Sequence, residues 1–313
     1  MNYYSPVLRR LALASLIGNV AIVVTGGVVR LTGSGLGCPT WPKCTHDSYI
    51  TTPEMGVHGW IENGNRMFAA VLGLLAIVLF VAALRERPRR PAVVRLAALT
   101  PLGVASQGLL GGVTVLAGLN PWTVAGHFLL SMAVIAVGYA LWRALGRPAG
   151  DAPAAPPPPR PVRTLVTLIV GVGAVVLTLG TLVTGAGPHA GDPDVPRLDV
   201  DLTMIAQLHV DVVFLLLGLS IGAWYALRAH GGRPAAVRAA AVLIGIELAQ
   251  GAIGFVQYFL HLPVLAVLAH MAGSCAVWLA ILALADRVRG SVPAEAGGRA
   301  VADARLSGAT VAS

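Results

Sequence analysis

Eight uninterrupted apolar stretches of about 20 residues determine what this chain can fold into, because a helix of that length spans the hydrocarbon core of a bilayer. The stretches are 11–29, 57–84, 96–118, 123–142, 164–184, 203–227, 239–260 and 263–285. Together they occupy most of the 313 residues, of which only 12% are charged. We therefore expect an all-α integral membrane protein with eight transmembrane helices. The short remaining loops exclude a soluble catalytic domain and a nucleic-acid-binding module.

The basic residues indicate how the chain is oriented. Eighteen of the 22 Lys and Arg residues lie on one side of the predicted topology, namely before 11, in 85–95, 143–163 and 228–238, and after 285. The opposite loops contain only Arg30, Lys43 and Arg197. Because cytoplasmic loops of membrane proteins are enriched in Lys and Arg, we expect a multi-pass plasma-membrane protein with both termini in the cytoplasm. The lipid bilayer accounts for the net charge of +8 without a nucleic-acid partner.

The two halves of the sequence repeat each other. Gln107 precedes His127 by 20 residues, and Gln250 precedes His270 by the same interval. The segments 61–65 and 205–209 also align, as do 24–26 and 183–185. This repeat predicts two pseudo-symmetric four-helix bundles in the same orientation. The predicted divisions are an N-terminal half at 1–145, a Pro-rich cytoplasmic linker at 146–163, a C-terminal half at 164–287 and a flexible cytoplasmic tail at 288–313.

Three histidines and one asparagine occupy equivalent places near the outer ends of the even-numbered spans. They are Asn65, His127, His209 and His270. A single such histidine is often only a hydrogen-bonded core residue, but three at equivalent positions favour function, because polar groups at membrane depth are costly. A haem can be held in a helical bundle by one axial histidine from each of two helices. Zinc would need three or four ligands at one point, so we favour haem iron.

Glu62 is an acidic residue within the second span, and it lies on nearly the same helical face as Asn65. Two interpretations are open. In one, Glu62 pairs with Arg66 at i, i+4. In the other, it serves as an acid or base facing a bound ligand.

The cysteines divide into a pair and a single residue. Cys38 and Cys44 share the first outer loop, in the sequence CPTWPKC, where an oxidising compartment lets a disulfide persist. The pair is either a structural crosslink or a redox-active disulfide, since short exposed disulfides tend to be more reducible. Cys275 stands alone in the last span, where we expect it to pack as a small apolar residue.

Several motifs, taken together, resemble haem A synthase, the membrane enzyme of cytochrome oxidase assembly. They are GGVVRLTGSGLGCPTWPKC at 26–44, IENGNR at 61–66, QGLLGG at 107–112 with His127, VTGAGPHAGD at 183–192 and QLHVD at 207–211. The resemblance extends from the first span to the eighth. It implies a haem-dependent oxidoreductase that oxidises the C8 methyl group of haem O to the formyl group of haem A through successive hydroxylations.

The resemblance also implies roles for individual residues and partners. Haem b is expected between His209 and His270, and the substrate haem O in the N-terminal half, with His127 as a ligand and Glu62 as the catalytic acidic residue. Cys38 and Cys44 match the outer-loop cysteine pair of the family. The implied partners are haem O and haem A, the farnesyltransferase that makes haem O, the cytochrome oxidase assembly machinery and an unidentified electron donor. The haem sites are expected towards the outer face.

The sequence departs from the family pattern at Asn65, where many members have a histidine. His58 is seven residues earlier, about 10 Å along a helix, so it cannot simply replace that ligand. A haem held by His127 alone would keep one coordination position open, as oxygen activation requires, whereas two-histidine haem suits electron transfer. We therefore expect a reactive first half and an electron-relaying second half. The loop at 187–201 also lacks the second cysteine pair found in some members.

Two other functions fit part of the pattern. An electron-transfer cytochrome b that leaves its haem unmodified would use the same histidines, but it does not explain Glu62 or the CPTWPKC loop. A transporter is suggested by the parallel repeat, but no span is broken by proline at mid-depth, as discontinuous transporter helices are.

Overall fold

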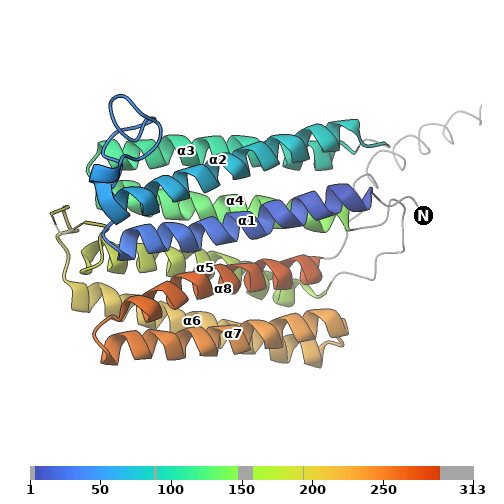
Figure 1. Cartoon of the computed structure of the whole chain (residues 1–313). Helices are drawn as coiled ribbons and strands as arrows, with labels where there is room; N and C mark the ends of the chain where they lie inside the picture. Colours follow the sequence, from blue (N-terminus) through green and yellow to red (C-terminus); the bar gives the residue numbers. More distant parts are fainter. Residues whose placement is uncertain (1–3, 88–89, 147–157, 193, 290–313) are drawn as a thin grey trace, which may run out of the picture.

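Eight long helices make up nearly all of the computed structural model, which describes residues 4–87, 90–146, 158–192 and 194–289. The helices are α1 (Pro6–Leu31), α2 (Gly56–Arg85), α3 (Pro91–Leu116), α4 (Pro121–Leu145), α5 (Arg160–Ala186), α6 (Leu202–Ala229), α7 (Pro234–Phe259) and α8 (Val264–Arg289), with a short 3-10 turn, η1 (Pro53–Met55), before α2. They lie side by side, with the connecting segments gathered at two opposite ends (Figure 1). All eight are long and apolar enough to cross a membrane.

Each expected span coincides with one helix to within five residues at either end. Most of the larger differences between the predicted and observed helix ends lie at the Arg-rich ends, where the helices continue past the end of the apolar stretch. For example, α3 begins at Pro91 and includes Arg95, and α7 begins at Pro234 and includes Arg238. Long basic side chains can extend their charged heads to the membrane surface, so a helix continues beyond its apolar stretch.

The helix starts follow local chemistry. Proline suits the first turn because its φ is preset and its missing N–H would have no intrahelical partner there. Four helices begin in this way, at Pro6, Pro91, Pro121 and Pro234. The side chains of Ser5, Asn120 and Asp201 accept hydrogen bonds from the first free backbone N–H groups of α1, α4 and α6.

Helix α3 continues through an internal proline. Pro101 cannot donate to the carbonyl of Ala97, but the Thr100 hydroxyl donates to that oxygen at 2.8 Å. A neighbouring Thr hydroxyl is a common way to satisfy such a carbonyl inside a membrane. The helix is therefore not interrupted at this point, in agreement with the sequence analysis.

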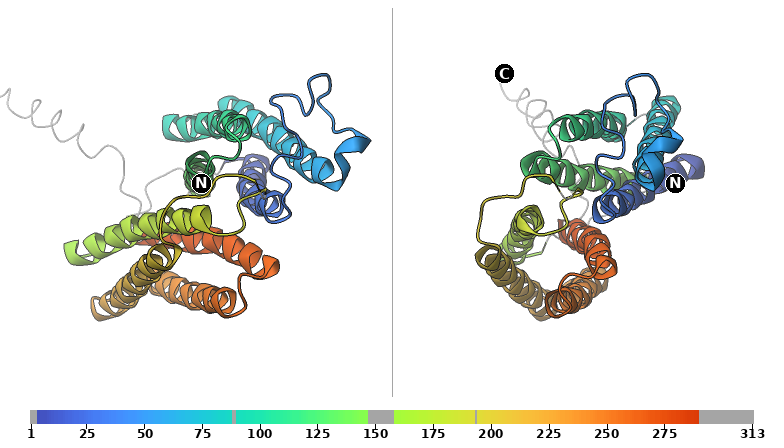
Figure 2. Two further views of the ribbon diagram at one scale, coloured as in Figure 1. Left: turned by 90° about the vertical axis from the view of Figure 1, so that its left-hand side faces the viewer. Right: turned by 60° about the vertical axis from the view of Figure 1, so that its left-hand side comes forward.

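The helices form two closed groups of four. In the first group α1 contacts α2 and α4, and α3 contacts α2 and α4; the second group, α5 to α8, is closed in the same way. Helices α1 and α4 face α5 and α8 across the boundary between the groups. End-on views show the two groups as adjoining bundles (Figure 2). Within the described residues, the diagonal pairs α2 with α4 and α6 with α8 make no backbone contact, so the helices of each pair lie across the bundle from each other.

The segments at the end opposite the Arg-rich helix ends join the two groups. The N–H of Gly35 donates to the carbonyl of Gly191 at 3.0 Å, and His189 donates from Nε2 to the carbonyl of Leu262 at 3.0 Å. Leu119, between α3 and α4, packs in a small apolar cluster with Ala190 and Val195. These loops therefore form one connected cap over both bundles.

At the opposite end, the two groups share an apolar core and one ion pair. Trp278 donates from its indole N–H to the carbonyl of Met132 at 2.9 Å. The Arg143 Nε lies 2.8 Å from a carboxylate oxygen of Asp286. These two residues are 143 positions apart, which is the offset of the repeat, so the ion pair joins equivalent positions of the two halves.

The predicted linker and tail fall largely outside the described residues, since 147–157 and 290–313 are not among them. At the end of the predicted linker, α5 begins at Arg160, so the last four linker positions form its first turn.

Candidate functional site

The glutamine–histidine pairs of the sequence repeat make the same contact in both halves. Gln107 on α3 donates from Nε2 to the carbonyl of His127 on α4 at 3.2 Å. Gln250 on α7 donates in the same way to the carbonyl of His270 on α8 at 2.7 Å. The repeat therefore extends from the sequence to individual hydrogen bonds between neighbouring helices.

Each of the three histidine rings lies against a glycine of the adjacent helix. A Cβ atom at these glycines would lie between 3.2 and 3.5 Å from the ring Cε1 atom, and the pairs are Gly111 with His127, Gly180 with His209 and Gly254 with His270. Contacts below about 3.4 Å are tighter than ordinary van der Waals contact. The glycines thus let the Cε1 edge of each ring come close to the backbone of its neighbouring helix.

The histidine rings have unused hydrogen-bonding capacity. The Nδ1 atoms of His127, His209 and His270 are buried, and none has a hydrogen-bond partner among the described residues. Buried polar atoms are nearly always hydrogen-bonded, so three such atoms at positions related by the repeat indicate a site that binds something more.

The second half brings two histidines to one site. His209 on α6 and His270 on α8 are close enough to interact electrostatically. Their helices are the diagonal pair of this bundle, which have no backbone contact with each other in the described part of the chain. Two imidazoles facing each other across the interior of a bundle are suited to hold a flat macrocycle between them. The residues present therefore fit a haem.

The first half has the corresponding histidine but a different residue opposite it. Asn65 on α2 is half-buried, and its Oδ1 accepts a hydrogen bond from the Thr25 hydroxyl at 2.7 Å. His58 is exposed in the first turn of α2, where its Nδ1 lies 2.9 Å from the Ser34 hydroxyl. The structure therefore brings no second histidine into the position across from His127.

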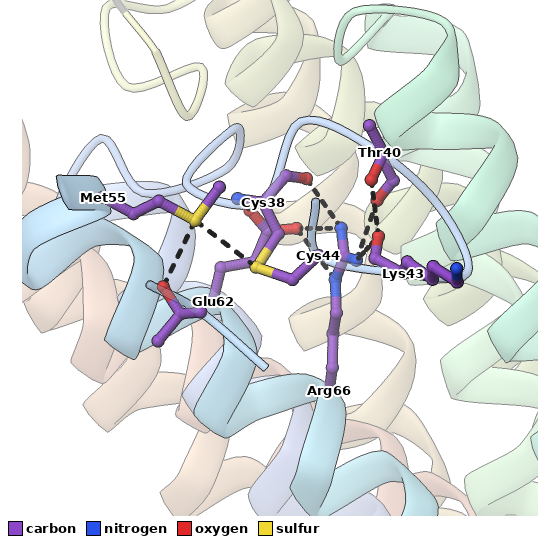
Figure 3. Close-up of polar contacts among 8 residues, drawn as sticks. Cys38, Thr40, Lys43, Cys44, Met55, Glu62 and Arg66 are labelled. Atoms are coloured by element: carbon purple, nitrogen blue, oxygen red, sulfur yellow. Dashed lines mark hydrogen bonds and ion pairs between the residues drawn. A yellow bond between two sulfur atoms is a disulfide. The ribbon is translucent and has the colours of Figure 1, made fainter. Parts of the chain in front are cut away.

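Glu62 lies beneath the disulfide loop, with both carboxylate oxygens engaged (Figure 3). Oε1 accepts from Arg66 Nη2 at 2.6 Å and from its Nε at 3.1 Å, and Oε2 accepts from the backbone N–H of Cys38 at 2.7 Å. Only 5% of the Glu62 surface is exposed. The i, i+4 ion pair, which was one of the two interpretations of Glu62, is thus present in the structure.

Arg66 extends the same network to the loop backbone (Figure 3). Its Nη1 donates to the carbonyls of Thr40 at 2.9 Å and Lys43 at 3.2 Å, and its Nη2 donates to the carbonyl of Cys38 at 2.8 Å. The charge pair therefore fixes the loop to α2. Sequence reasoning missed this role, because it depends on how the loop folds back over the helix.

Cys38 and Cys44 form a disulfide, and both residues are fully buried. The loop that they close places Trp41 against Gly112 on α3, where a side chain would clash with the indole ring. Gly112 follows Gly111, which contacts His127. The disulfide loop, Glu62 and His127 therefore belong to one region of the first half. Cys275 is buried and unpaired in α8, as expected.

Another buried acid lies in the second half. The Ser220 hydroxyl on α6 donates to Glu247 Oε1 on α7 at 2.9 Å, and the other carboxylate oxygen is buried without a partner among the described residues. Asp211 is exposed and accepts a hydrogen bond from Gln207 at 2.7 Å. Neither residue was assigned a role from the sequence.

Comparisons with known proteins agree on one family. The model of a family described as "Cytochrome oxidase assembly protein" matches residues 9–282. A haem A synthase of Methylorubrum extorquens is 30% identical over 88% of this chain and 85% of its own length. One from Methylobacterium radiotolerans is 30% identical over 82% of this chain and 83% of its own length.

Other relatives align over shorter regions. A haem A synthase of Shouchella clausii is 31% identical over 35% of this chain, and the aligned part spans 36% of that relative's length. The alignment with this relative thus covers about a third of the chain, whereas those with the Methylorubrum and Methylobacterium proteins cover more than four fifths of it.

Proposed function

The chain belongs to the cytochrome oxidase assembly protein family, and on this premise we propose that it oxidises the C8 methyl group of haem O to the formyl group of haem A. It is a multi-pass membrane oxidoreductase with eight helices. The observation that carries the proposal is that His127, His209 and His270 each lie against a glycine and each have a buried Nδ1 atom without a partner among the described residues. Such a repeat provides two comparable haem positions within one membrane protein.

The second half is proposed to hold haem b between His209 and His270. Their position on diagonal helices and their mutual interaction support this assignment. The chemistry that haem b supplies in such a site is one-electron transfer. Gly180 and Gly254 would leave room for the two rings against the neighbouring helices, and Gln250 would hold the backbone of α8 at the position of His270.

The first half is proposed to bind the substrate haem O. His127 would hold the iron from one side, while Asn65, engaged with Thr25, would leave the opposite side open. This difference between halves is consistent with a reactive site in the first bundle and an electron relay in the second. The disulfide loop, with Trp41 packed on Gly112, would limit access of water from the outer face.

Glu62 is proposed as the catalytic acidic residue beside the substrate. Its carboxylate is held by Arg66 and by the Cys38 N–H. The oxygen bound by the loop, Oε2, accepts one hydrogen bond among the described residues and keeps a lone pair that can take a proton. The residues therefore couple proton handling at Glu62 to the position of the disulfide loop. Arg66 would keep the charge of the pair balanced within the low-dielectric bundle.

The cellular setting is proposed from the charge pattern. Both termini are assigned to the cytoplasm and the haem sites to the outer half, because Lys and Arg are concentrated at the opposite end of the helices. The proposed partners are the farnesyltransferase that supplies haem O, the cytochrome oxidase assembly machinery that receives haem A, and an electron donor for the reaction.

The decisive experiment expresses the chain in bacteria with and without the haem O-producing farnesyltransferase and identifies the extracted haems by chromatography and mass. We expect haem A or its hydroxylated precursor only when haem O is supplied. Glu62→Ala should lower this product by about a hundredfold or more, while the haem between His209 and His270 remains. Loss of all haem in that variant would instead make Glu62 structural.

An electron-transfer cytochrome b is the alternative outcome of the same experiment. Haem b alone in both strains, with undiminished haem O, would establish it and overturn the proposed synthase activity. Glu62→Gln serves as the matched variant, because it keeps the shape and one hydrogen-bonding oxygen of the side chain but removes its charge. Product formation in Glu62→Gln comparable to that of the parent chain would show that the carboxylate does not handle a proton.

A further inference from the structure

Arg30 reaches from the first half of the protein into the second. It lies in the last turn of α1, and its guanidinium donates from Nη2 to the carbonyl of Thr184 on α5 at 2.9 Å. Its Nε donates to the carbonyl of His189 in the loop that follows α5. A residue of the first bundle therefore contributes a positive charge to the outer end of the second bundle.

Among the described residues, no carboxylate forms an ion pair with Arg30. The ion pairs among the described residues are Glu62 with Arg66 and Arg143 with Asp286, and neither involves Arg30. The nearby charged side chain is Arg197, which has the same sign and interacts electrostatically with Arg30. Arg197 is itself bound to backbone carbonyls, those of Val195 and Pro188. Arg30 and Arg197 are thus two neighbouring, half-buried cations, and the acceptors that each of them binds among the described residues are uncharged backbone carbonyls.

Such an arrangement is costly unless an anion completes it, because partly buried like charges repel and each loses hydration. A guanidinium has five N–H donors, and the described structure uses two of those on Arg30. The remaining donors are suited to a carboxylate, which arginine can bind through two parallel hydrogen bonds. The pair therefore has both the charge and the geometry for an anionic ligand.

Arg66 in the first half provides the contrast. It is a cation at the same outer end, but it is neutralised by Glu62 and its remaining donors are used by the loop carbonyls of Cys38, Thr40 and Lys43. Arg66 has a structural assignment that accounts for its charge. Arg30 and Arg197 have none within the described part of the protein.

The depth of Arg30 relates it to the proposed haem b site. Thr184, whose carbonyl it binds, lies one helical turn outward from Gly180, and Gly180 contacts the ring of His209. Four residues of α-helix rise about 6 Å. The guanidinium therefore lies roughly one turn outward from the level of the His209 ring, towards the face at which the carboxylate edge of a haem would emerge.

We propose that Arg30 binds a propionate carboxylate of the haem held by His209 and His270, and that Arg197 adds to the positive potential there. This inference rests on the proposed haem b site and deepens it, because it makes the first half part of the second half's binding site. The ligand group is a carboxylate, and its removal from the haem should remove the contribution of Arg30.

The test compares haem b with its dimethyl ester, in which both propionates are blocked. Full-length protein from a haem-deficient host is titrated with each compound, and the two-histidine absorption spectrum reports binding. We expect the parent chain to bind the free acid at least about tenfold more tightly than the ester, the effect of one charge-assisted hydrogen-bonded contact. In Arg30→Gln this ratio should fall to about one, and in Arg197→Gln it should fall by a smaller factor.

Arg95→Gln is the matched control, because it removes an exposed arginine from the Arg-rich end of the bundle and should leave the ratio unchanged. A ratio near one in the parent chain, or an unchanged ratio in Arg30→Gln, would overturn the proposal. If Arg30→Gln does not accumulate, the comparison of free-acid and ester binding is made in the parent chain and in Arg197→Gln. A preference for the free acid that falls in Arg197→Gln would support the proposal, and no preference in the parent chain would overturn it. A purely structural role of Arg30 would weaken the binding of both compounds equally.

His209→Ala separates this inference from the proposed function. If that variant keeps the two-histidine spectrum, the haem b site is wrongly assigned, whatever the ratio for Arg30→Gln. If His209→Ala loses the spectrum, and Arg30→Gln still binds the free acid more tightly than the ester by the same factor as the parent chain, the haem b site is correctly assigned and the propionate contact is wrong.

Discussion

The two four-helix bundles use the same contacts around one histidine and differ around the other. Gln107 donates to the carbonyl of His127 in the first bundle, and Gln250 donates in the same way to the carbonyl of His270 in the second. Opposite these histidines, however, the first bundle has Asn65, bound to Thr25, where the second has His209. A shared scaffold thus fixes one histidine in the same way in both halves, and the halves differ at the residue across the bundle from it.

The outer segments differ as well. The first bundle is covered by a disulfide loop that Glu62 and Arg66 fix to α2, whereas the corresponding loop of the second bundle contains no cysteine and is bound by Arg30 from α1. Dedicated loops at the outer end therefore distinguish two bundles whose helices follow one plan. The difference suggests a division of labour, which the following experiments can break or sharpen.

The largest effect is expected from removing the proposed haem ligand that only the second bundle has. His209→Ala should abolish the two-histidine haem spectrum, because a single remaining ligand cannot produce it, and turnover should fall to background. His127→Ala should leave that spectrum intact and still stop conversion of haem O. Absorption spectra of the purified variants provide the measurement, and loss of the spectrum in both variants would show that the bundles do not bind haem independently.

The next effect comes from making the bundles alike. Asn65→His should give the first bundle a second ligand, so that bound haem O becomes six-coordinate and turnover falls by about tenfold or more, since the open position is lost. Spectra in the presence of haem O and product analysis report both changes. Thr25→Val is the control, because it breaks the Asn65 hydrogen bond without adding a ligand. Unchanged spectra and full turnover in Asn65→His would rule out the open-site interpretation.

A smaller effect should follow from opening the disulfide loop. Replacing Cys38 and Cys44 by serine removes a crosslink across six residues, which should lower the free energy of unfolding by about 2 kcal/mol in the chain-entropy model. Thermal denaturation in detergent measures the change, and Cys275→Ala controls for loss of a buried sulfur. The two-histidine spectrum of the second bundle should remain, and its loss would mean that the loop supports both halves.

The smallest effect compares two glycines. A methyl group at Gly111 would lie 3.2 Å from His127, and one at Gly254 would lie 3.5 Å from His270, which is ordinary contact. Both changes to alanine raise helix propensity equally, so any difference reports the ring contact. We expect Gly111→Ala to weaken haem binding by about 1 kcal/mol more than Gly254→Ala, the cost of moving a ring off its preferred rotamer. Titration with haem measures it, and equal effects would contradict the expectation.

Hydropathy was sufficient to predict the eight helices, because each span must satisfy its backbone internally and present apolar side chains to lipid. Hydropathy did not predict that α3 includes Arg95 and that α7 includes Arg238. An apolar stretch ends at the first charged residue, whereas the helix can continue past an arginine whose charged head reaches the membrane surface.

The site was predictable where it depends on spacing along one helix or on the repeat. The Glu62 and Arg66 contact follows from i, i+4 spacing, and the equivalence of His127 and His270 follows from the offset. The contact of Arg30 with Thr184 joins residues 154 positions apart through the packing of two bundles. No spacing or repeat in the sequence predicts this contact. From the sequence, Arg30 was therefore only one of three basic residues in the predicted outer loops.

The ion pair between Arg143 and Asp286 has a consequence for how the two halves associate. These are equivalent positions of the two repeats, and they meet across the boundary between the bundles. Two copies of one half, associating through the same faces, would place the same residue on both sides of this contact, and like charges would repel. The pair therefore favours association of one half with the other over association of either half with a copy of itself.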